Sequence, residues 1–143
     1  MRCILINQFH PPAVAPTGQV MADLARTLAA RGHEVVVLCA DDGYDDGSRS
    51  RWRREHIDGY AVVRLGIVGG GRRHPLARLA GYASFAAAVG AWLATRSRSG
   101  DIIVPLTTPP YLGLVARLAA ARGASLVHWI MDLYPDVLAA HGI

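Results

Sequence analysis

At 143 residues the chain has the length of one domain that can bury a hydrophobic core, and 52% hydrophobic residues exclude a largely disordered protein. The formal net charge of +4 comes entirely from arginine, because the sequence contains no lysine. Arginine-only usage also arises from genome bias, so the charge does not indicate a nucleic-acid-binding protein. Cys3 and Cys39 lie in apolar runs without metal-ligand spacing, and we expect buried reduced thiols and no metal site.

The first forty residues predict a strand, a loop, a helix and a second strand. Residues 3–6 form a short apolar run, and after a turn-rich loop the apolar side chains recur with helical spacing. These helical positions are Val20, Met21, Leu24, Ala25, Leu28 and Ala29. Gly32 ends the helix, and residues 35–38 are apolar without polar alternation. Strands that are apolar on both faces need cover on both sides, which predicts a parallel α/β sheet flanked by helices.

The loop at residues 7–19 follows the first predicted strand, and ligands of parallel sheets bind at the carboxyl ends of the strands. Thr17 is a candidate N-cap, and Gly18 leaves the backbone open to a ligand, so a phosphate could bind at this helix N-terminus together with Gln19. The alternative is that Thr17 and Gly18 simply begin a helix. Neither a dinucleotide-binding fingerprint nor a P-loop is present.

Asp58 and Gly59 separate two extended runs and predict a β-hairpin. The first run carries Arg51, Arg53 and Arg54, which we expect at an exposed sheet edge. Two interpretations remain open for these arginines: a solvated face, or contact with an anionic phospholipid or a diphosphate-bearing substrate. The acidic loop at residues 41–48 lacks the ligand spacing of a calcium site, and we interpret it as a solvated loop.

The second half of the chain begins with a linker at residues 69–74, and Pro75 then opens a helix. Its uncharged stretch at residues 79–95 is slightly short of the ~20 residues of a membrane span, and we expect a buried helix. A strand at residues 101–106 then delivers Thr107 and Thr108 to the carboxyl edge of the sheet.

A helix at residues 112–122 and a last strand at residues 125–130 complete the predicted sheet. Asp132 follows this strand directly, which makes it a candidate site residue at the same edge. The alternative role is capping of a short helix after Pro135, for which Asp136 is better placed. The strand residue His128 is more typical of a core histidine.

Several stretches, in this order, resemble the amino-terminal domain of GT-B glycosyltransferases of the family-4-like type, closest to the branch that builds bacterial surface polysaccharides such as colanic acid and O-antigen. They are residues 4–9 (ILINQF), 11–12 (PP), 17–19 (TGQ), 31–35 (RGHEV), 57–64 (IDGYAVVR), 101–104 (DIIV), 107–110 (TTPP) and 129–136 (WIMDLYPD). Each motif is weak alone, but their order across nearly the whole chain is specific.

The resemblance implies one Rossmann-like half of a GT-B fold, with core strand order 3-2-1-4-5 and a sugar acceptor bound on this side. It implies transfer from a nucleotide-sugar to a glycan or lipid-linked acceptor with retention of configuration and without a metal or other cofactor. Gly18 and Thr17 match the loop near the donor phosphates, and Asp132 is carried over as the catalytic residue. Met131 stands where many relatives have histidine, and a thioether can neither transfer a proton nor bind a hydroxyl well.

We expect residues 1–143 to be an incomplete amino-terminal domain, inactive as a transferase unless a donor-binding carboxyl-terminal domain completes it in cis or in trans. The alternative is a non-catalytic module that binds or recruits a lipid-linked substrate or a partner enzyme. A flavodoxin-like nucleotide-binding protein is a third reading, disfavoured because the glycine fingerprint is absent. No secretory signal pattern is visible, so we expect a cytoplasmic protein, in one version peripheral at the inner face of the membrane.

Overall fold

The computed structural model describes residues 1–41, 52–68 and 75–131, and within them the chain forms six strands and three helices. The elements in chain order are β1 (Arg2–Ile6), α1 (Pro16–Ala30), β2 (Glu34–Asp41), β3 (Arg53–Ile57), β4 (Tyr60–Gly66), α2 (Pro75–Arg96), β5 (Ile102–Pro105), α3 (Leu112–Ala120) and β6 (Ser125–Leu126). Each predicted strand and helix of the described ranges therefore forms near its expected position.

The strands form one sheet in the order β3-β4-β2-β1-β5-β6, and only β3 runs antiparallel to its neighbour. The five parallel strands reproduce the predicted core order 3-2-1-4-5. The predicted hairpin joins β3 to β4, and both turn residues, Asp58 and Gly59, have positive φ angles of 48° and 84°. Because a two-residue turn of this hand matches the twist of the strands, the Asp-Gly pair was a reliable signal.

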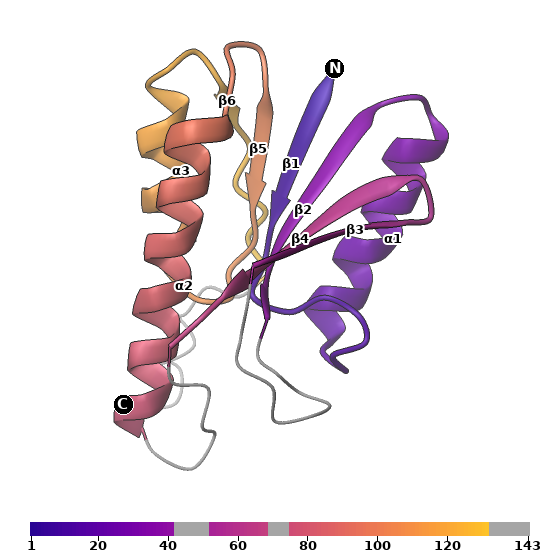
Figure 1. The fold of residues 1–143 in the computed structure, drawn as a ribbon. Coiled ribbons are helices and arrows are strands. Elements are labelled where there is room, and N and C mark those ends of the chain that lie inside the picture. Colours follow the sequence, from indigo (N-terminus) through magenta and orange to yellow (C-terminus); the bar gives the residue numbers. More distant parts are fainter. Residues whose placement is uncertain (42–51, 69–74, 132–143) are drawn as a thin grey trace.

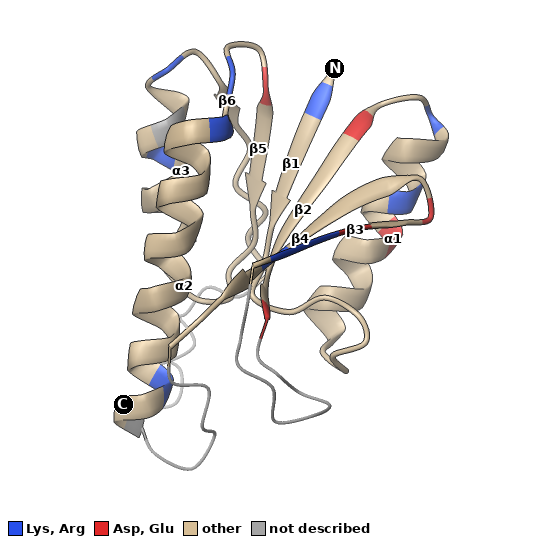
Figure 2. Ribbon diagram, in the orientation of Figure 1, with Lys and Arg blue, Asp and Glu red and all other residues tan. Residues whose placement is uncertain are grey.

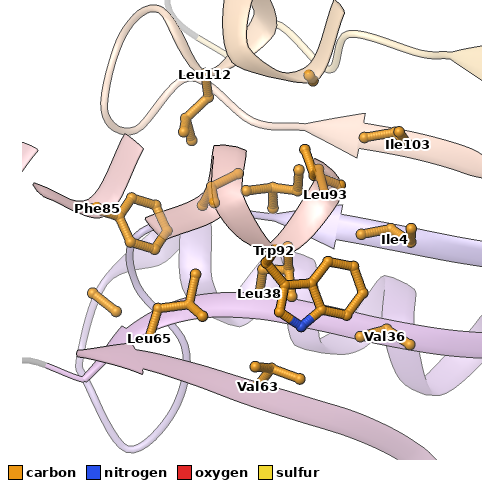
Figure 3. Packing of buried hydrophobic residues seen from close by; sticks show 14 of the residues in the cluster. Ile4, Val36, Leu38, Val63, Leu65, Phe85, Trp92, Leu93, Ile103 and Leu112 are labelled. Atoms are coloured by element: carbon orange, nitrogen blue, oxygen red, sulfur yellow. The ribbon is translucent and has the colours of Figure 1, made fainter. Parts of the chain in front are cut away.

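The sheet lies between two helical layers, with α1 on one face and α2 and α3 on the other (Figure 1). Alternate residues of β2 supply both cores: Val36 and Leu38 pack toward α2 and α3, whereas Val35 and Val37 pack toward α1. Figure 3 shows the first of these cores, with aromatic and leucine side chains of α2 packed against the sheet. This two-sided burial explains why β2 has no polar alternation.

Helix α2 buries only one of its faces. Phe85, Val89 and Leu93 pack into the core, but Leu76 and Leu79 near the beginning of the helix are 81% and 63% exposed. The prediction of a buried helix therefore holds for one face and is wrong for the other. By length and composition alone, Leu76–Arg96 could cross a membrane. In the fold, 28% of its most apolar stretch of 18 residues is buried.

The last predicted strand is shorter than expected, but the chain stays extended beside β5 after β6 ends. The backbone N–H of Val127 donates to the carbonyl oxygen of Ile103 at 2.9 Å, and that of Trp129 donates to Pro105 at 3.1 Å. Residues 127–129 therefore run toward the carboxyl end of β5, as the sequence predicted for this segment.

Several predictions fall on residues 42–51, 69–74 and 132–143, outside the described part of the chain. They are residues 42–48 of the acidic loop, Arg51, the linker before α2, Asp132 and the short helix after Pro135. Asp41, predicted as the first residue of the solvated loop, is instead the last residue of β2 and pairs with Arg53.

Candidate functional site

Three chain segments meet at the carboxyl edge of the sheet, which we call the rim. The backbone N–H of Gln8, just after β1, donates to the carbonyl oxygen of Thr108 at 2.9 Å. On the other side, the N–H of Ala40 in β2 donates to the Gln8 carbonyl oxygen at 2.9 Å. The segment after β1 therefore lies between β2 and the segment after β5. The structure thus brings the predicted Thr107 and Thr108 beside the predicted loop at residues 7–19.

Thr17 is not the N-cap of α1, and this prediction was wrong. The cap residue is Ala15, in an extended conformation (φ −136°, ψ 131°), and no side chain bonds the cap. Pro16 takes the first helical position, where its fixed φ suits the helix and its missing N–H costs nothing, so the helix begins one residue earlier. The Thr17 hydroxyl instead accepts a hydrogen bond of 3.3 Å from the Asn7 amide nitrogen.

Gly18 is required for packing at the rim. A Cβ atom at this position would lie 3.0 Å from the Phe9 carbonyl oxygen and 3.1 Å from the Phe9 carbonyl carbon, so a side chain would fit only if the loop backbone moved away from α1 by a few tenths of an ångström. The N–H groups of Gly18 and Gln19 already donate to the Ala15 carbonyl oxygen. The helix N-terminus therefore offers fewer free donors than the sequence suggested, and phosphate binding there stays a prediction.

Unpaired acceptor atoms gather at the rim. Among the described residues, three buried side-chain polar atoms lack a hydrogen-bond partner: Asn7 Oδ1, Gln8 Oε1 and Thr107 Oγ1. All three belong to the segments that follow the central strands β1 and β5. A buried polar atom without a partner costs about 1–3 kcal/mol, so three of them at one edge call for partners that the described residues do not supply, either water or a ligand.

The orientation of the Asn7 amide follows from its neighbours. Its nitrogen lies 2.9 Å from the Phe9 carbonyl oxygen, which can only accept a hydrogen bond. The amide oxygen must therefore point away from Phe9, and it remains an acceptor that a hydroxyl group could satisfy. Gln8 and Thr108 are partly exposed, so this polar layer lies directly beneath the surface of the rim.

His10 is buried and connects the loop at residues 7–19 to β4. Its Nδ1 lies 3.0 Å from the Pro11 carbonyl oxygen, so Nδ1 carries the proton, and Nε2 then accepts from the Tyr60 hydroxyl at 3.1 Å. Burial lowers the pKa of His10, and the nearby Arg64 adds to this effect, although the bond to Pro11 opposes it. His10 is therefore a neutral structural residue that ties the loop to β4.

The arginines of β3 and β4 nearest the rim are already paired. Arg64 donates to Glu55 at 2.5 Å and to the Pro11 carbonyl oxygen at 2.6 Å, and Arg53 donates to Asp41 at 3.1 Å. Arg54 has no hydrogen bond or ion pair among the described residues. Of the three arginines predicted at the sheet edge, Arg53 is therefore paired, Arg54 is available, and Arg51 lies outside the described residues.

The sequence reasoning missed Asn7, Gln8 and His10. A signal for Asn7 and Gln8 was present, because two polar residues directly follow the buried strand β1. Met131 is exposed and follows residues that run toward the carboxyl end of β5. Asp132 lies outside the described residues, so its role stays a prediction. The described residues contain no group of three or more histidine, cysteine or acidic side chains that could hold a metal ion.

Comparison with known families agrees with this geometry. Residues 17–142 match the model of the glycosyl transferase 4-like domain. No curated protein matches the chain.

Proposed function

Since this chain belongs to the glycosyl transferase 4-like family, we propose that its rim holds the sugar acceptor in a transfer from a nucleotide-sugar, with retention of configuration. The observation that carries the proposal is the set of three unpaired acceptor atoms at the rim. Sugar hydroxyls are strong donors, and a ligand that supplies them would relieve the cost of the unpaired atoms. The acceptor would be a glycan or a lipid-linked sugar of a surface polysaccharide.

We further propose that the donor diphosphate is held by a second, nucleotide-binding domain, joined in cis or added in trans. A leaving diphosphate needs positioned positive charge or hydrogen-bond donors. On this side of the cleft, Arg53 and Arg64 are engaged by Asp41 and Glu55, and the first turn of α1 has lost two N–H groups to Ala15. The chain alone is therefore expected to bind acceptor and to transfer sugar poorly or not at all.

The test compares kinetic constants for the two substrates. The chain is assayed with a nucleotide-binding domain, fused or added separately, a UDP-sugar and a polysaccharide acceptor. Thr107→Val and Gln8→Met remove acceptor atoms at nearly constant shape, so each should raise the acceptor KM about tenfold and leave the donor KM unchanged. Thr27→Val, at an exposed position in the last turn of α1, is the matched control.

An unchanged acceptor KM in both rim variants would overturn the acceptor assignment. A rise in the donor KM instead would assign the rim to the donor phosphates. This is the role that the sequence predicted for Thr17 and Gly18. Asp132 keeps its proposed catalytic role, for which Asp132→Asn should lower kcat without changing either KM.

A second candidate function is a non-catalytic module that attaches to the inner face of the cytoplasmic membrane. A specific observation favours it: both α2 and α3 have exposed leucines, neither helix contains an acidic residue, and the charged residues of both are arginines (Figure 2). The exposed leucines are Leu76, Leu79, Leu114 and Leu118. Apolar side chains beside arginines are the pattern that anionic membranes attract.

Vesicle sedimentation separates this candidate from the first. If the chain attaches through α2, Leu76→Ser with Leu79→Ser should release it from phosphatidylglycerol vesicles. If it attaches through the β3 arginines, a variant with alanine at positions 51, 53 and 54 should release it instead. The membrane candidate is rejected if neither variant changes the bound fraction.

A further inference from the structure

A groove separate from the rim lies on the α2 face of the sheet. It has a volume of about 320 Å³ and forms where α2 covers β4 and leaves the edge strand β3 beyond the helix. The lining residues come from the beginning of β3, from β4 and from the last turns of α2. They are Trp52, Arg53, Arg54, Val63, Trp92, Thr95 and Arg96.

Two tryptophans give the groove its apolar surface. The indole of Trp92 lies beside Val63 and is 8% exposed, so it forms a fixed wall (Figure 3). Trp52 is 55% exposed immediately before β3. An exposed indole next to a partly covered one is costly in water and is typical of a surface that receives a ligand.

Two arginines give the groove its charge. Arg54 pairs with Val63 across the antiparallel ladder, so its side chain lies on the α2 face of the sheet, and Arg96 approaches from the end of the helix. Neither side chain has a hydrogen bond or an ion pair among the described residues. Between residues 59 and 131 the sequence has one acidic residue, Asp101, and its carboxylate is paired with Arg2. Arg2 also donates to the backbone carbonyl oxygen of Arg96, so this acidic group lies near the end of α2 but is already neutralised by Arg2.

We propose that this groove binds an anionic saccharide, a sugar ring that carries a carboxylate or a phosphate. Indole faces pack against the C–H faces of a sugar ring, and a guanidinium group pairs with an anion in planar geometry. The volume is at the lower end of small-ligand pockets and suits one or two rings. The choice of a sugar rests on the proposed function, and the groove would hold acceptor units distant from the reacting one.

A membrane surface is the weaker occupant. The tryptophans line a concave groove instead of projecting as an apolar ridge, and the exposed leucines lie elsewhere, on α2 near its beginning and on α3. A lipid headgroup would use the two arginines but would leave the indoles of Trp52 and Trp92 without a matching ring.

The experiment follows the indole N–H signals of the isolated chain by NMR during titration. The probe is a disaccharide of two galacturonic acid units, and its methyl ester is the neutral counterpart. We expect the signals of Trp52 and Trp92 to shift with the acid and about tenfold less with the ester at equal concentration. Trp129 packs on the α1 side of the sheet and should not respond. No donor is present, so failure here does not test sugar transfer.

Variants decide whether the arginines contribute. Arg54→Gln with Arg96→Gln should weaken binding about tenfold, whereas Arg78→Gln, at the other end of α2, should leave it unchanged. These side chains are exposed, so the fold should tolerate the changes. Equal affinity of the double variant and the control would overturn the proposal. So would a response of Trp129 alone, inorganic phosphate binding as tightly as the disaccharide, or binding to phosphatidylglycerol vesicles only.

Discussion

Buried polar groups are paired at the amino ends of the parallel strands (the amino edge) and unpaired at their carboxyl ends (the carboxyl edge, or rim). At the amino edge, Asp101 accepts hydrogen bonds from Arg2 Nε at 2.9 Å, from Arg2 Nη2 at 2.5 Å and from the N–H of Arg98 at 2.6 Å. At the carboxyl edge, the acceptors of Asn7, Gln8 and Thr107 have no partner. The hydrogen bonds at the amino edge stabilise the fold. The unpaired acceptors at the carboxyl edge destabilise it, and a ligand that donated hydrogen bonds to them would remove this cost.

The largest expected effect tests the amino edge. Asp101→Ala leaves the Arg2 guanidinium without its partner, and the two side chains are only 4% and 11% exposed. We expect the free energy of unfolding to fall by about 3 kcal/mol, measured by urea denaturation. Asp23→Ala, which removes the exposed ion pair with Arg26, is the matched control and should have a much smaller effect. Equal losses in both variants would mean that the buried pair has no special role.

The next effect concerns the helix that borders the rim. Gly18→Ala forces a Cβ against the Phe9 backbone and should destabilise the fold by about 2 kcal/mol. Gly90→Ala meets only Val115 Cγ1 at 3.4 Å and should instead stabilise α2 by up to about 1 kcal/mol. Thermal unfolding of the two variants should therefore shift in opposite directions. A neutral Gly18→Ala would show that the loop can retreat from α1, which weakens the packing role given to this glycine.

A smaller effect is expected at the rim, where substitution of two threonines should change stability in opposite directions. Thr107→Val removes an unpaired buried hydroxyl and should stabilise the fold by about 1 kcal/mol, while acceptor binding weakens about tenfold. Thr17→Val removes a hydroxyl that accepts from Asn7, so it should destabilise. Urea denaturation of both variants provides the measurement. Destabilisation by Thr107→Val would imply that its hydroxyl has a partner in solution.

The smallest effect is the pH dependence of the free energy of unfolding, which should appear in a different pH range at each edge of the sheet. The lowered pKa of His10 means that the unfolded chain binds a proton more readily, so stability should fall as the pH drops below the ordinary histidine pKa of about 6.5. His10→Gln should flatten the slope of unfolding free energy between pH 7 and 5. Identical slopes in the wild type and the variant would contradict this prediction.

At the amino edge, burial alone would raise the pKa of Asp101, but the hydrogen bonds from Arg2 and Arg98 hold it below its usual value. Its contribution is present above the unfolded pKa of about 3.9 and is lost only as the pH falls through the folded pKa. The Asp101→Ala variant should therefore lose its deficit relative to the wild type at strongly acidic pH.

Local signals predicted most of the fold. The apolar runs of β1 and β2, the helical spacing of α1 and the turn at Asp58 and Gly59 are properties of neighbouring residues, and the structure confirms each. The prediction of Thr17 as the cap of α1 is wrong because Pro16 takes the first helical position and moves the cap to Ala15. The composition of α2 predicts a buried helix, but composition does not reveal that only one face of this helix meets the sheet.

The sequence by itself determined which segments become strands and helices, and its ordered motifs pointed to the glycosyl transferase 4-like family. Only the tertiary structure decided which polar atoms stay unpaired at the rim and that two tryptophans and two arginines share one groove. The physical reason is distance along the chain: these partners come from segments tens of residues apart. Periodicity describes neighbours in a helix or strand, whereas pairing across the sheet depends on how those elements pack.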